Sequence, residues 1–202
     1  MKRFNITGPC IPELHYMADI TDKLNAVRKM IDYGDYFTIN RARQYGKTTM
    51  LQAIERTCSI TYLVLRISFE GLGESVFSSE HRFIDSFTKL IFKELEYHNA
   101  AQYLLDIWNT DLIKSDFHEL GNKITSLNKS SDKKILLLID EVDKYSDNQV
   151  FLDFLGLLRT LYLDRMKRVT FHSIILTGVY DIKILSSNER MEKTNVRIHL
   201  GI

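Results

Sequence analysis

A glycine, a lysine and two threonines stand together as GKTT within residues 36–51, YFTINRARQYGKTTML. A short apolar run precedes them and apolar residues at helical spacing follow, which predicts the order strand, loop, helix. Glycine lets the backbone approach an anion closely, and the start of a helix aims unpaired N–H groups at that anion. We therefore predict a phosphate-binding loop in which Lys47 reaches the terminal phosphates of a nucleotide and Thr48 ligates Mg²⁺.

The loop departs from the common pattern G-x-x-x-x-G-K-[ST], because Arg41 occupies the position of the first glycine. The alternative interpretation is a glycine turn followed by a solvated helix, and GKT alone does not exclude it. The residues that we expect to contact the nucleotide are Arg43, Gln44, Tyr45, Gly46, Lys47, Thr48 and Thr49.

A second signal lies at residues 135–143, ILLLIDEVD. A continuous apolar run predicts a strand covered on both faces, as in a parallel sheet between helices. Open α/β sheets bind ligands at the carboxyl ends of their strands, where Asp140 and Glu141 would lie. We assign Asp140 to Mg²⁺ and Glu141 to the attacking water of a nucleotide hydrolase. The alternative is that the acidic pair only caps the next helix.

A strand predicted at residues 169–176, VTFHSIIL, is followed by Thr177. We expect this strand beside the acidic one, with Thr177 sensing the terminal phosphate, and count it with Glu141 as catalytic. His172 is interpreted as a packed histidine without a catalytic role. A basic cluster, Arg165, Lys167 and Arg168, follows a predicted helix. We interpret it as a favourable interaction with the helix dipole rather than as a nucleic-acid-binding patch.

The other predicted elements connect these motifs. They are helices at 19–34, 80–98, 117–127 and 150–161, a strand at 60–69, loops at 70–79 and 127–134, and a short strand at 196–200. In the N-terminal segment, Ile11, His15 and Tyr16 are candidates for an adenine pocket, although ordinary packing is an open alternative.

Composition limits the class of protein. The chain has 202 residues, 45% of them hydrophobic, which suits one well-buried domain. Its formal net charge of +1 gives no global electrostatic reason to expect nucleic acid as a partner. Cys10 and Cys58 have no metal-binding spacing and are interpreted as reduced thiols. No apolar stretch is long enough for a membrane span, so we expect neither a membrane partner nor a location outside the cytoplasm.

The loop R-A-R-Q-Y-G-K-T resembles that of the AAA-like ATPase families of prokaryotes, which typically read R-x-R-[RQ]-[FY]-G-K-[ST]. The resemblance also covers residues 8–16, 67–71, 137–143 and 174–181. It implies a three-layer α/β/α P-loop NTPase with a mainly parallel sheet in the strand order 5-1-4-3-2. It further implies Walker A and Walker B motifs, ATP and Mg²⁺ as ligands, and a nucleotide-driven switch.

Relatives in those families continue into a fifth strand and a helical lid, whereas residues 185–202 are polar and poorly periodic. We therefore expect an ATPase core at 1–184, an irregular tail at 185–202, and no complete fifth strand or lid. The leading hypothesis is a slow Mg-ATP hydrolase that switches an effector protein or self-associates. The alternative is a non-catalytic nucleotide-binding or interaction module, and the chain could be a fragment. An arginine finger is not identified, and the candidates are Arg41, Arg43, Arg159 and Arg190.

Overall fold

The computed structural model describes Arg3 and residues 13–16, 19–40, 47–109, 116–178 and 197–198. Its centre is a parallel sheet in the order β2-β3-β4-β1-β5, which confirms the predicted strand order. The strands are β1 (Tyr36–Asn40), β2 (Leu63–Ser68), β3 (Ile135–Asp140), β4 (Ser173–Gly178) and β5 (Arg197–Ile198). The two-residue β5 pairs with β1 at Thr38 and Ile39 and lies within the short strand predicted at 196–200.

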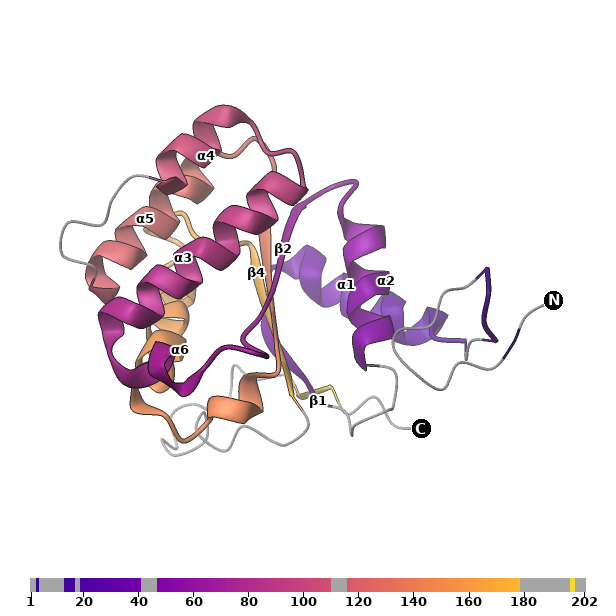
Figure 1. Cartoon of the computed structure of the whole chain (residues 1–202). Helices are drawn as coiled ribbons and strands as arrows, with labels where there is room; N and C mark the ends of the chain where they lie inside the picture. The colour runs from indigo at the N-terminus through magenta and orange to yellow at the C-terminus, as the bar shows by residue number, and fades with distance from the viewer. Residues whose placement is uncertain are drawn as a thin grey trace.

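Helices cover both faces of the sheet and make three layers, as predicted (Figure 1). On one face lie α1 (Thr21–Tyr33) and α2 (Lys47–Cys58). The other face carries α3 (Glu80–Tyr97), α4 (Gln102–Asn109), α5 (Phe117–Ser130) and α6 (Gln149–Leu163). Two 3₁₀ helices, η1 (Glu74–Ser78) and η2 (Val142–Tyr145), follow β2 and β3.

Alternating side chains of β1 to β4 contribute to two separate hydrophobic cores. In β3, Leu136 and Leu138 join the core under α1 and α2, whereas Leu137 and Ile139 join the core under α3 to α6. All six residues of β3 are buried, because helices cover both faces. A central strand of this kind holds its carboxyl end, and the acidic residues there, in a fixed position.

Capping residues define several helix ends. Asp19 accepts a hydrogen bond from the backbone N–H of Thr21 at 2.9 Å, and α1 ends at Gly34, whose φ of 73° favours glycine. The side chains of Asp116 and Asn148 accept from backbone N–H groups in the first turns of α5 and α6. These caps fix where the loops around the sheet begin and end.

Two local predictions differ from the structure, and one helix was not predicted. The strand predicted at 169–176 begins only at Ser173 and includes Thr177. The residues before Ser173 form a loop beside the start of β3, where the His172 N–H donates to the Ile135 carbonyl. Part of the predicted loop at 127–134 is the last turn of α5, held by the buried Leu127 and Asn128. The helix α4 was not predicted, and it buries Leu104 and Trp108 against α3 and α5.

Candidate nucleotide site at the carboxyl ends of the strands

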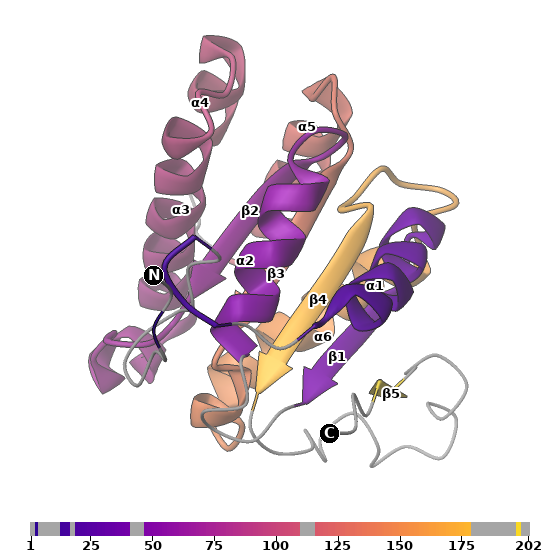
Figure 2. The same cartoon turned by 90° about the vertical axis from the view of Figure 1, so that its right-hand side faces the viewer.

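Four predicted site residues meet at the carboxyl ends of β3 and β4. Lys47 is the first residue of α2, Asp140 ends β3, Glu141 follows it, and Thr177 lies near the end of β4. Parallel pairing puts the carboxyl ends of the strands at one end of the sheet, where the arrowheads of β1 and β4 in Figure 2 point. Side chains that are far apart in the sequence thereby come into contact.

The amine of Lys47 lies between the two carboxylates. Its Nζ is 3.1 Å from Asp140 Oδ1 and donates a hydrogen bond to Glu141 Oε1. These side chains are only 12%, 11% and 25% exposed, so the charges interact with little screening by water. Burial lowers the pKa of Lys47, but the hydrogen bonds and charges of Glu141 and Asp140 outweigh this and raise its pKa overall. The amine therefore stays protonated, as a ligand for phosphate must.

Thr177 contacts the same carboxylate. Its hydroxyl donates to Asp140 Oδ1 at 2.5 Å, and the backbone N–H of Glu141 donates to that oxygen at 2.9 Å. Thr177 is fully buried and Asp140 is 8% exposed. The position of Asp140 is thus fixed by three donors, Lys47 among them, and the hydroxyl of Thr177 is directed at this carboxylate.

Glu141 adopts an uncommon backbone conformation. Its φ of 58° and ψ of 38° lie in the left-handed region, which costs an L-residue roughly 1–2 kcal/mol. Conformations of this kind persist when the surroundings enforce them, and they are concentrated at functional sites. Here the conformation turns the chain sharply from β3 into η2 and leaves the carboxylate of Glu141 beside Lys47.

Asp143 and Gly178 mark a close approach beside this cluster. A Cβ atom on Gly178 would lie 2.9 Å from Asp143 Oδ1, so the absence of a side chain keeps this space open. Asp143 Oδ1 is buried and has no hydrogen-bond partner among the described residues. Sequence reasoning did not select Asp143, although its place two residues after Glu141 could have suggested it.

Other predicted residues are placed less fully. Thr48 is exposed and Thr49 is half-buried in the first turn of α2, and His15 is buried whereas Tyr16 is 53% exposed. Arg159 lies in α6, on the opposite face of the sheet from α2. The remaining predictions lie outside the described residues: Ile11, Arg41, Arg43, Gln44, Tyr45, Gly46 and Arg190.

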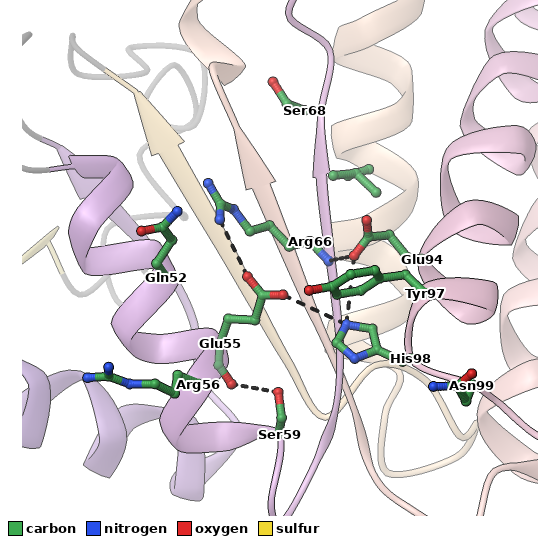
Figure 3. Close-up of a pocket in the computed structure, with 11 residues that line it drawn as sticks. Gln52, Glu55, Arg56, Ser59, Arg66, Ser68, Glu94, Tyr97, His98 and Asn99 are labelled. Atoms are coloured by element: carbon green, nitrogen blue, oxygen red, sulfur yellow. Dashed lines mark hydrogen bonds and ion pairs between the residues drawn. The ribbon is translucent and has the colours of Figure 1, made fainter. Parts of the chain in front are cut away.

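A groove of about 990 Å³ lies elsewhere, along the free edge of β2 between α2 and α3 (Figure 3). There Arg66 pairs with Glu55 at 3.4 Å, and its backbone N–H donates to Glu94, which satisfies one donor of the sheet edge. His98 lies 3.9 Å from both carboxylates. None of the predicted nucleotide-site residues lines this groove.

The described residues contain no cluster of three or more histidine, cysteine, aspartate or glutamate side chains suited to hold a metal ion. Every helix in the described part of the chain is too short or too polar to cross a lipid bilayer.

Comparisons with known proteins place this chain in a family. A sequence profile for the AAA-like domain matches residues 14–189. The chain therefore belongs to the AAA-like family of P-loop ATPases, as the phosphate-loop pattern predicted. A search of curated protein sequences gives no match.

Two solved structures have a similar fold. The ORC1 protein of Aeropyrum pernix, solved in complex with DNA, aligns with a TM-score of 0.50 at 9% identity, over 90% of this chain. This chain spans 45% of that protein. ORC of Drosophila, solved bound to DNA, aligns with a TM-score of 0.49 at 12% identity, over 88% of this chain and 86% of the other. Our expectation that nucleic acid is an unlikely partner gains no support from the ORC1 structure, which was solved in complex with DNA.

Proposed function

We propose that the protein binds Mg-ATP at the carboxyl ends of β3 and β4, hydrolyses it slowly, and uses the exchange of partners at Lys47 as a switch. The observation that supports this proposal is the contact of Lys47 with both Asp140 and Glu141. In this role Lys47 would leave the carboxylates to contact the β and γ phosphates. Asp140 and the hydroxyl of Thr48 would then ligate Mg²⁺.

The described residues suit the proposed ligands. Mg²⁺ prefers oxygen donors and keeps several waters, and the described part of the site offers the carboxylates of Asp140 and Glu141 and the hydroxyl of Thr177. Thr177 would hold Asp140 in the orientation that the metal requires, and Glu141 would accept a proton from the attacking water. Bound Mg²⁺ would stabilise the negative charge that develops on the phosphates.

The first experiment measures thermal unfolding with ATP alone, Mg²⁺ alone and both together. At about a hundredfold excess over the dissociation constant, Mg-ATP should add roughly 2.7 kcal/mol to the free energy of unfolding. Mg²⁺ alone should add almost nothing, because the described protein groups do not form a complete metal site. An equal stabilisation by Mg²⁺ alone would contradict this arrangement of ligands.

The second experiment assigns roles to single residues. Lys47→Ala should abolish ATP binding, with Lys23→Ala on α1 as the control for loss of a lysine. Asp140→Asn should weaken the affinity that depends on Mg²⁺, whereas Glu141→Gln should retain ATP and block its cleavage. Calorimetry and phosphate release measure the two effects. Identical effects of the two carboxylate substitutions on affinity and turnover would contradict the division of roles.

The same measurements decide between hydrolysis and binding alone. If the wild-type protein binds Mg-ATP but releases no phosphate, the chain acts as a nucleotide-binding module and Glu141 has no catalytic role. The switch would act on an effector protein or on a second copy of this chain, in the cytoplasm. A change in sedimentation on addition of ATP would support self-association.

A further inference from the structure

A second pocket lies at the opposite end of the sheet from Lys47 and Asp140. It has a volume of about 380 Å³ and is bounded by the end of α1, the loop before β3 and the segment between α6 and β4. The hydrogen bond from the His172 N–H to the Ile135 carbonyl, 2.8 Å long, joins the last two of these segments. Three loops that are distant in the sequence thus form one recess beside the amino ends of β3 and β4.

Positive charge gathers around this pocket. Residues 131–135 and 163–172 contain five cations and two carboxylates, and the third segment, residues 31–35, adds Asp32, which pairs with Arg28, and Asp35. Lys133, Lys134 and Arg165 line the pocket, and Lys167 and Arg168 lie on the same exposed segment. Among the described residues, none of the five cations forms an ion pair with a carboxylate. Their charge is available to an external anion.

Two of these cations are held in place by neutral groups. Lys133 Nζ donates to the carbonyls of Ser59 and Ile60 at 3.2 and 3.3 Å. The Arg165 guanidinium lies 4.0 Å from the centre of the Tyr162 ring and donates to the Tyr162 carbonyl. These contacts position the cations without neutralising them, and they therefore favour binding of a negatively charged ligand.

Two buried polar atoms of residues that line the pocket have no partner among the described residues. They are the hydroxyl oxygen of Thr170 and Nε2 of His172. Thr170 is 9% exposed, so its hydroxyl is almost fully removed from bulk water. A buried polar group without a partner destabilises the fold, and a phosphate oxygen that accepted from the Thr170 hydroxyl would supply the missing partner.

Exposed apolar side chains accompany the cations. Tyr33 is 81% exposed and Met166 is 90% exposed, and both line the pocket. Exposed tyrosine rings beside a positively charged surface are the combination on which the bases of single strands stack. A pocket for a small inorganic anion has no need of such a ring.

We propose that this pocket binds single-stranded nucleic acid. Lys133, Lys134 and Arg165, together with Arg168 on the same exposed segment, contact backbone phosphates. The Thr170 hydroxyl donates to one of these phosphates, and Tyr33 stacks on a base. This function is separate from the nucleotide site, which lies at the other end of the strands. The proposal replaces our earlier interpretation that Arg165, Lys167 and Arg168 interact only with the helix dipole. That interpretation did not include Lys133 and Lys134.

The test uses fluorescence anisotropy of a labelled oligothymidylate of about 16 nucleotides, titrated with the full chain at several salt concentrations. The double variant Lys134→Glu/Arg168→Glu should bind about tenfold more weakly and reduce the slope of log K against log salt by about 1.4 or more. The matched control is Lys89→Glu/Lys93→Glu, which makes the same change of charge on the exposed side of α3. Equal weakening by both double variants would overturn the proposal.

A second pair of variants tests stacking. Tyr33→Ala should weaken binding about fivefold or more, whereas Tyr97→Ala, which removes a similarly exposed ring from α3, should not. No binding at about 50 mM salt would overturn the proposal. Competition by inorganic phosphate together with unchanged binding of Tyr33→Ala would also overturn it and point to a small-anion site.

Lys47→Ala separates this site from the proposed nucleotide site. If the pocket binds the oligonucleotide, Lys47→Ala should retain oligonucleotide binding and lose ATP, and Lys134→Glu/Arg168→Glu should show the reverse. Loss of oligonucleotide binding in Lys47→Ala alone would place the strand at the carboxyl ends of β3 and β4 and overturn the proposal. Failure of ATP to bind the wild type would leave the oligonucleotide result unaffected.

Discussion

The left-handed backbone at Glu141 predicts an unusual order of stability for two substitutions. Glu141→Ala and Glu141→Gly both remove the carboxylate that contacts Lys47, so the loss of that contact cancels when the two are compared. They differ in the cost of φ at 58°. An alanine pays this steric cost and a glycine does not. The glycine variant should therefore be the more stable of the two, the reverse of the usual order.

The magnitude follows from two opposing effects. Relief of the left-handed conformation favours glycine by roughly 1–2 kcal/mol. The greater freedom of glycine in the unfolded chain favours alanine by about 0.4–1 kcal/mol. The glycine variant should thus exceed the alanine variant by about 0.5–1 kcal/mol in free energy of unfolding. Both variants should fail to hydrolyse ATP, since each lacks the proposed proton acceptor.

Urea unfolding at neutral pH without nucleotide measures this difference, provided that both variants give the same dependence on urea.

Two existing glycines serve as controls for the assay. Gly71 has a φ of 80° and open space around its Cβ position, so Gly71→Ala should destabilise. Gly156 lies in α6, also with open space, and Gly156→Ala should stabilise by about 1 kcal/mol. A Glu141→Ala variant as stable as Glu141→Gly would refute the reasoning from backbone strain.

Two further predictions concern buried polar groups. Thr177→Val should lose about 1.5–3 kcal/mol of stability, because a hydrogen bond to the buried Asp140 carboxylate disappears; urea unfolding measures this, and no loss would contradict it. Burial and the charge of Lys133 lower the pKa of His98 below 6.5, although Glu55 opposes them. As the pH falls through 6.5, the unfolded chain therefore binds more protons than the folded protein, which lowers the free energy of unfolding. The wild type should lose more stability in this range than His98→Gln, which has no imidazole to protonate. Parallel pH profiles of unfolding for these two proteins would contradict the second prediction.

The layers of the fold and the location of the proposed nucleotide site could both be predicted from the order of the amino acids. The uninterrupted apolar run of β3 required cover on both faces, and the aromatic stripe of α3 required a core to face it. Because parallel strands align their carboxyl ends, Lys47, Asp140 and Glu141 could be assigned to one site from their positions in the motifs alone. The layers and the position of the site follow from the local hydrophobic periodicity, because this periodicity indicates which faces of each helix and strand are buried.

Which side chains touch one another could not be predicted in this way, because it depends on the tertiary fold. The hydroxyl of Thr177 reaches Asp140 rather than an open site, and Glu141 takes a left-handed conformation that its residue type does not indicate. Lys134 and Arg165 lie 31 positions apart in the sequence yet line one pocket. Contacts of this kind depend on the register of β3 against β4 and on where the loops beneath them fold. The periodicity of the sequence predicts neither the register nor the position of these loops, because it describes only residues two to four positions apart. Residues distant in the sequence come into contact only when the sheet assembles.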